Sequence, residues 1–114
     1  MTQGFKMFIV KFVSEKSNDE FLALPTKLRA KMAQMILLLE KFGKLGEPHT
    51  KKLQDELFEL RIKAQEGIAR AIYAYQKDRV ILILVVFVKK SQKTPKTFLD
   101  KAKQRLEEFE NGND

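Results

Sequence analysis

The chain has 114 residues, a formal net charge of +7, no cysteine and a single histidine. This composition excludes disulfides, thiolate metal sites and metal centres built from several histidines. The excess of lysine and arginine favours a polyanionic partner, and phosphate is the first choice.

The first half of the chain predicts one strand followed by two helices. Aromatic and β-branched residues dominate positions 5–13, as is typical of a strand. The polar residues 17–19 offer N-caps for a short helix that begins at Glu20, and Pro25 interrupts that helix. Apolar residues spaced three and four apart then predict a longer helix over Thr26–Phe42, which ends at the following glycine.

The second half predicts three strands and a final helix. The strands are expected over 56–63, 67–75 and 79–88, and their short connections indicate an antiparallel meander. The third strand is apolar on both faces, so it should be an inner strand covered from both sides. A proline in the first turn supports a helix over 96–109, and residues 110–114 are predicted to be a frayed tail.

The predicted order of elements is β-α-α-β-β-β-α, which indicates one compact α+β domain over residues 1–114. The N-terminal residues alternate and carry lysines, unlike a secretory signal. The longest apolar run, Val80–Val88, has nine residues, far fewer than the roughly 20 that a membrane-spanning helix needs. We therefore expect a soluble cytoplasmic protein.

Charged residues interrupt two neighbouring strands of the predicted meander. If Ile62 pairs with Gly67, Glu59 lies opposite Arg70 and Arg61 lies on the same face of the sheet. Glu59 is either one half of an ion pair that orients the strands or part of a catalytic site. The two arginines suit phosphate, because a guanidinium donates two hydrogen bonds in fixed geometry and stays charged.

Lysines gather directly after the last predicted strand. Each alone is an ordinary solvated side chain, but together they follow a rigid buried strand and favour contact with nucleic-acid phosphates. These candidates for RNA binding are Lys89, Lys90, Lys93 and Lys96.

The loop before the meander adds a candidate for proton transfer. His49 carries the imidazole, the side-chain type that titrates near neutrality, although a lone loop histidine is also compatible with ordinary surface. Lys51 and Lys52 follow it and extend the RNA-binding set, and Tyr73 either stacks on a base or belongs to the core. No glycine-rich phosphate loop or acidic metal cluster occurs in the sequence, so neither a metal ion nor a cofactor is predicted.

Three segments resemble the RelE/ParE toxin superfamily. They are Lys52–Arg61, which contains Leu-Phe-Glu-Leu-Arg; Arg70–Tyr73; and Val86–Pro95, which contains the more specific Phe-Val-Lys-Lys-Ser-Gln-Lys-Thr-Pro. The resemblance runs from about Phe5 to Phe109, and its nearest branch is the HigB-like group of phage-derived proteins. It implies a compact RelE-like fold.

The resemblance also implies the toxin of a type II toxin–antitoxin pair. Ribosome-dependent members enter the ribosomal A site and cut mRNA without a metal: the 2′-hydroxyl attacks the adjacent phosphate and leaves a 2′,3′-cyclic phosphate and a 5′-hydroxyl. The matching positions assign Arg61 and Arg70 to the scissile phosphate, and Lys89, Lys90 and Lys93 to the RNA backbone.

The general acid and base are where this chain departs from some relatives, because residues 98–114 contain no histidine or tyrosine. His49, Glu59 or a lysine of lowered pKa remains for these roles. The implied partner is an antitoxin with a helix-turn-helix, through which alone the pair would bind operator DNA; no membrane partner is expected. The alternatives are a ParE-like inhibitor of DNA gyrase and a basic RNA-binding domain without catalysis.

Overall fold

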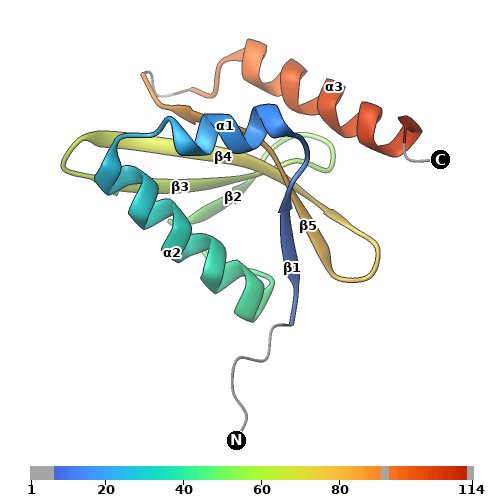
Figure 1. Cartoon of the computed structure of the whole chain (residues 1–114), viewed down its shortest axis with the longest axis horizontal. Coiled ribbons are helices and arrows are strands. Elements are labelled where there is room, and N and C mark those ends of the chain that lie inside the picture. The colour runs from blue at the N-terminus through green and yellow to red at the C-terminus, as the bar shows by residue number, and fades with distance from the viewer. Residues whose placement is uncertain (1–6, 91–92, 113–114) are drawn as a thin grey trace, which may run out of the picture.

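The computed structural model describes residues 7–90 and 93–112. The described residues form one sheet in the order β1-β5-β4-β3-β2, with every neighbouring pair antiparallel except β1 and β5 (Figure 1). This confirms the predicted α+β class and the antiparallel meander. The elements are β1 (Ile9–Phe12), α1 (Glu15–Leu22), α2 (Thr26–Phe42), β2 (Thr50–Lys52), β3 (Phe58–Ala64), β4 (Gly67–Gln76), β5 (Val80–Val88) and α3 (Lys96–Gly112).

Strand β2 corrects the predicted order β-α-α-β-β-β-α, which lacked it. Its three residues are too few to show an alternating pattern, and the strand exists because Thr50 pairs with Leu60 of β3. It forms the edge of the sheet next to β3.

The register between β3 and β4 also differs from the predicted one. Ala64 pairs with Gly67, so Arg61 rather than Glu59 lies opposite Arg70. A slip of two residues keeps each side chain on its predicted face, whereas a slip of one would have reversed it. Glu59 therefore remains on the face of Arg70 and reaches it diagonally.

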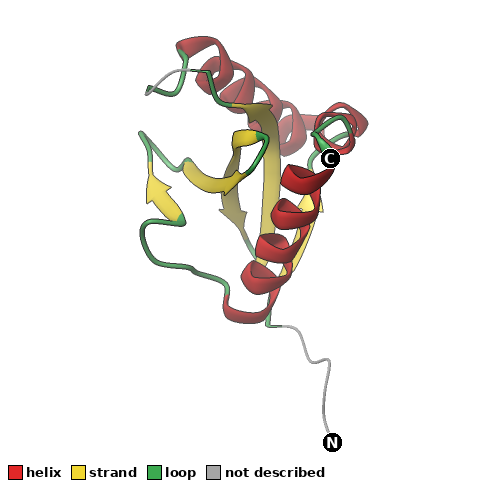
Figure 2. Cartoon of the chain, turned by 90° about the vertical axis from the view of Figure 1, so that its left-hand side faces the viewer, coloured by secondary structure: helices red, strands yellow, loops and turns green. Residues whose placement is uncertain are grey.

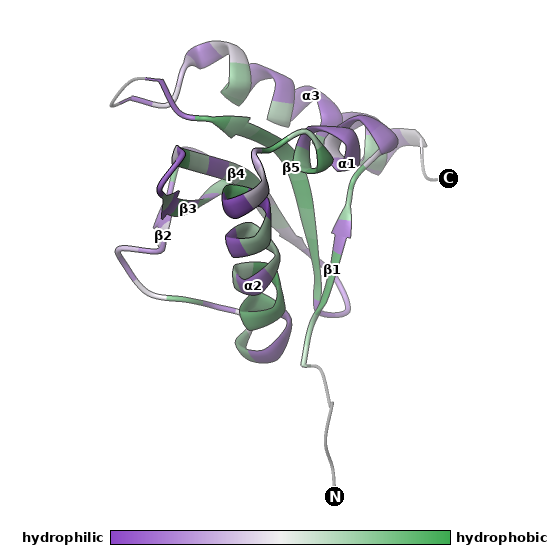
Figure 3. Cartoon of the chain, turned by 60° about the vertical axis from the view of Figure 1, so that its left-hand side comes forward, coloured by the Kyte–Doolittle hydropathy of each residue, from purple (hydrophilic) through white to green (hydrophobic). Residues whose placement is uncertain are grey.

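The sheet is covered by helices on both faces (Figures 1 and 2). Leu28 and Met32 of α2 pack against one face, and Ala102 and Leu106 of α3 pack against the other. Residues of β5 alternate between the two cores except at Leu84 and Val85, which both face α3, and the hydrophobic colour in Figure 3 continues along this strand. This confirms the prediction that the most apolar strand is an inner one. No helix in residues 7–90 and 93–112 is long and apolar enough to cross a membrane.

Two helix boundaries differ from the predicted ones. Helix α1 begins at Glu15 rather than Glu20, because Ser14 and Ser17 form a capping box in which each hydroxyl accepts the other residue's backbone N–H. Helix α3 continues to Gly112, so residues 110–112 are helical rather than a frayed tail. Residues 113–114, like the first two residues of the predicted strand 5–13, lie outside the described residues. Helix α2 has its predicted bounds.

Candidate functional site

A polar trio with two buried members and a half-buried threonine lies on the α3 face of the sheet. Glu59 is 2% exposed and Arg70 is 6% exposed. One terminal nitrogen of Arg70, Nη1, donates to Oε2 of Glu59 at 2.8 Å and to the hydroxyl of Thr94 at 2.9 Å. That hydroxyl in turn donates to the same carboxylate oxygen at 2.6 Å. The trio thus joins β3, β4 and the segment before α3, and it fixes the guanidinium of Arg70.

Arg61 lies directly opposite Arg70, but its side chain is exposed. Its backbone is anchored, since its N–H donates to the carbonyl oxygen of His49 at 2.8 Å. The two arginines thus differ in kind, because Arg61 presents its guanidinium to solvent whereas Arg70 is built into the protein.

Lys89 completes a group of positive charges on this face. Its backbone N–H donates to the carbonyl of Ile68 at 2.7 Å, which extends the β4–β5 ladder by one residue. Partial desolvation, followed by the positive charges of Arg70, Arg61 and Lys51, lowers the pKa of Lys89 below its usual value, and Glu59 opposes this shift. We call Arg61, Arg70, Lys89 and Lys51 the cationic cluster.

The remaining lysines of the predicted site differ in their exposure and in their contacts. Lys90 and Lys93 are exposed near the end of β5, whereas Lys96 forms a surface ion pair with Asp100 at 2.9 Å. Lys52 donates to the carbonyl of Asp55 at 2.6 Å, and its ammonium lies 5.6 Å from the ring centre of Phe58. Phe58 packs with the core on the α2 side, so Lys52 is separated from the cationic cluster.

His49 and Tyr73 have different positions relative to this cluster. His49 is exposed and lines a cavity of about 260 Å³ together with Arg61, so the structure brings these two residues together. Tyr73 is 1% exposed and packs in the core on the α2 side. Burial raises its pKa, with a further contribution from Tyr75. The sheet therefore separates Tyr73 from the arginines.

Thr94 is the site residue that the sequence analysis missed. It lies within the Lys-Thr-Pro segment that carried the family resemblance, but a threonine beside a proline before a helix carries no signal of its own. Only the fold shows that its hydroxyl bridges Glu59 and Arg70. Among the described residues, no group of three or more histidine, aspartate or glutamate side chains could hold a metal ion.

Comparisons with known proteins agree with this architecture. The family model of the phage-derived Gp49-like proteins (DUF891) matches residues 19–107. Among solved structures, the chain is similar to an arginine-to-alanine double mutant of the Escherichia coli toxin RelE in the free state, with a TM-score of 0.63 and 14% identity over 86% of this chain and 96% of that chain. A comparison with curated proteins gives no match. The chain therefore belongs to the phage-derived Gp49-like family, and its fold is similar to that of RelE.

Proposed function

We propose that this protein is the toxin of a type II toxin–antitoxin pair, of the HigB-like kind, and that it cuts mRNA on the ribosome. The observation that carries the proposal is the cationic cluster, in which an exposed Arg61 lies beside a buried, fixed Arg70 and a Lys89 of lowered pKa. The Gp49-like family and the RelE-like fold support it.

The proposed reaction is an internal transfer at one phosphate of the RNA. The 2′-oxygen forms a bond to phosphorus, the bond to the 5′-oxygen breaks, and the products are a 2′,3′-cyclic phosphate and a 5′-hydroxyl. Lys89 takes the proton of the 2′-hydroxyl, because its lowered pKa makes the neutral amine more abundant than in an ordinary lysine. His49, beside Arg61, gives a proton to the leaving 5′-oxygen.

The arginines stabilise the charge that develops on the phosphate. Arg61 donates from the solvent side, and Arg70 contributes a positive charge whose position Glu59 and Thr94 hold. Glu59 and Thr94 are thus positioning residues. The lysines that follow Lys89 in the chain contact the backbone of the mRNA or of ribosomal RNA. They are Lys90, Lys93 and Lys96.

The proposed partners follow from the family rather than from the geometry of the site. A cytoplasmic antitoxin with a helix-turn-helix would silence the toxin, and the pair would bind operator DNA through that antitoxin. A ParE-like inhibitor of DNA gyrase shares the RelE-like fold, so the fold alone does not separate the two activities.

The test is expression from a tightly controlled promoter in bacteria, followed by mapping of transcript 5′ ends. We expect new 5′-hydroxyl ends within translated frames for the natural chain and for Lys77→Ala, a control in the exposed β4–β5 turn. Arg61→Ala should lose these ends, with a fall in rate of about 10²–10³. Growth arrest with intact mRNA and trapped gyrase–DNA complexes would replace the nuclease with a gyrase inhibitor, and the absence of arrest would leave an RNA-binding domain.

A further inference from the structure

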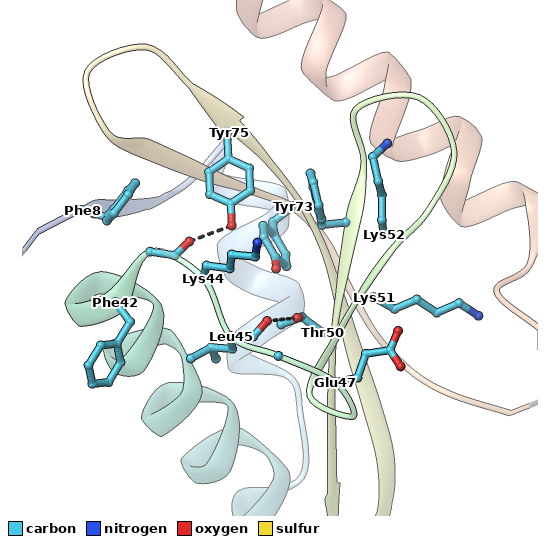
Figure 4. Close-up of a pocket in the computed structure, with 13 residues that line it drawn as sticks. Phe8, Phe42, Lys44, Leu45, Glu47, Thr50, Lys51, Lys52, Tyr73 and Tyr75 are labelled. Carbon is cyan, nitrogen blue, oxygen red and sulfur yellow. Dashed lines mark hydrogen bonds between the residues drawn. The ribbon is translucent and has the colours of Figure 1, made fainter.

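A second concave site lies on the opposite face of the sheet from Arg61 and Arg70. It is a cavity of about 670 Å³ between the sheet and the loop that follows α2. Figure 4 shows Tyr73, Tyr75 and Lys44 converging in its centre, whereas Lys51 points away.

The walls of this cavity are aromatic and held in place. The ring centres of Phe58, Tyr73 and Tyr75 lie 5.2 to 5.9 Å apart. The hydroxyl of Tyr75 donates to the carbonyl of Gly43 at 2.7 Å, and the hydroxyl of Thr50 donates to the carbonyl of Leu45. These two bonds fasten the loop to the sheet, so the cavity exists before any ligand enters.

The lining specifies a ligand with a flat ring and a negative charge. Aromatic side chains bind nucleobases through their ring faces, and stacking tolerates any base. Lys44 and Lys52 add positive charge to the lining and outnumber its one carboxylate, Glu47. The volume falls within the range of roughly 300–1,000 Å³ that is typical of small-molecule sites. A nucleotide has this combination of ring, charge and size.

The cavity also adjoins a smaller one at the edge of the sheet, on the side of the cationic cluster. Thr50 and Lys51 of the edge strand β2 line both this cavity and a smaller one of about 220 Å³, which includes Glu59 and Arg61. An RNA strand that passes around β2 can place a phosphate at the cationic cluster and a nearby base in the aromatic cavity.

We propose that the aromatic cavity binds the base of a nucleotide close to the phosphate at the cationic cluster, through stacking that accepts any of the four bases. The cutting of RNA at that phosphate rests on the proposed function, whereas the binding of a nucleotide in the cavity does not.

The chain itself supplies the probe for this proposal. It contains two tyrosines and no tryptophan, and both tyrosines line the cavity. With ¹³C-labelled tyrosine rings, we expect the four nucleoside 5′-monophosphates to shift these NMR signals saturably, whereas ribose 5-phosphate, which lacks a base, should not. Equal shifts with ribose 5-phosphate, or no shifts with any nucleotide, would overturn the proposal.

Variants assign the effect to the cavity. Tyr75→Leu removes one ring and should raise the Kd by about 5- to 150-fold, as the loss of one stacked base does. Tyr75→Phe keeps the ring but loses the hydroxyl that donates to Gly43, so its Kd should rise less than that of Tyr75→Leu; circular dichroism of each variant checks that it folds. Lys44→Ala should raise the Kd about two- to fivefold, and Lys41→Ala, an exposed lysine that does not line the cavity, should not. Unchanged affinity in Tyr75→Leu would contradict the assignment.

Transcript mapping separates this proposal from the proposed nuclease. If Tyr75→Leu weakens nucleotide binding while Arg61→Ala abolishes cutting, both proposals stand. If cutting depends on Arg61 but nucleotides leave the tyrosine signals unchanged, the cavity proposal fails alone. If nucleotides bind but no RNA is cut, the nuclease fails alone. Signals that respond to an acidic aromatic peptide and not to nucleotides would overturn the base-binding site in favour of a protein segment.

Discussion

At the scale of single residues, the structure separates two arginines that the sequence treats alike. Arg70 is buried with Glu59, and removal of one member of a buried pair leaves the other charge without compensation. We expect Arg70→Ala to lower the free energy of unfolding by about 3–5 kcal/mol, whereas the exposed Arg61→Ala should change it by less than about 0.5 kcal/mol. Urea unfolding measures both values.

A double variant checks the physical reason for this difference. Glu59→Leu combined with Arg70→Met removes both charges and should recover most of the stability that Arg70→Ala loses. Its RNA cutting should stay low, because the fixed positive charge is gone. Equal stability of the two single arginine variants would contradict the burial argument.

Lys89 gives the proposed reaction its pH dependence. Its pKa lies below the usual value, so the neutral amine appears at lower pH than in an ordinary lysine. If neutral Lys89 accepts the 2′-hydroxyl proton, kcat/KM on programmed ribosomes should rise with pH and level off above this lowered pKa. Lys89→Arg stays charged and should lose both the rise and about 10²–10⁴ in rate. A fall of kcat/KM over the same pH range would instead indicate that Lys89 acts as a cation.

The same shift affects folding in a direction that follows from linkage. Because the folded state binds this proton more weakly than the unfolded state, the free energy of unfolding should rise with pH between the lowered pKa and the ordinary pKa of lysine. The comparison of the natural chain with Lys89→Ala by urea unfolding isolates this contribution, since the variant should lack it.

At the scale of elements, the end of α2 depends on one glycine. Gly43 has φ of 76°, and a Cβ placed there would lie 2.0 Å from Cε1 of Phe8. Gly43→Ala should therefore lower the free energy of unfolding by more than the roughly 1–2 kcal/mol cost of a left-handed alanine. Gly46→Ala is the matched control, because a Cβ there meets nothing within 4 Å. Thermal unfolding followed by circular dichroism compares the two, and equal melting temperatures would contradict this account.

The helices and strands also show which parts of the fold can be predicted from the sequence. Helix α2 and strand β5 were predictable because their apolar patterns extend over many residues. The start of α1 differs from the prediction because Ser14 is the N-cap and forms a capping box with Ser17. The polar residues 17–19 are equally good N-cap types, so the sequence alone does not choose between the two starting points. Strand β2 was missed because its pairing is decided by β3 rather than by its own sequence.

The candidate site was predictable in its charges but not in its partners. Alternation placed Glu59, Arg61 and Arg70 on one face, and a register error of two residues preserved that face. The hydroxyl of Thr94 and the aromatic cavity around Tyr75 depend on segments distant in the chain. Such contacts have no local pattern to reveal them.

At the scale of the whole molecule, we expect RNA binding to depend on where the charges of the +7 protein lie, and not on the net charge alone. Lys90 lies just beyond β5, near the cationic cluster, whereas Lys77 lies in the turn before β5, at the other end of the same strand. Each phosphate contact releases condensed counterions, so the salt dependence of binding counts the contacts. For single-stranded RNA, we expect Lys90→Ala to reduce the slope of log Kd against log salt by about 0.7.

Lys77→Ala carries the same change of net charge and should leave that slope almost unchanged, because no RNA phosphate lies near it in the proposed complex. Affinity measurements by fluorescence anisotropy over a series of salt concentrations compare the two variants directly. If both variants reduced the slope equally, the RNA would respond to the total charge of the protein and not to the surface around the cationic cluster. A loss confined to Lys90→Ala would instead place the RNA backbone at the end of β5, where Arg61 and Lys89 can reach its phosphates.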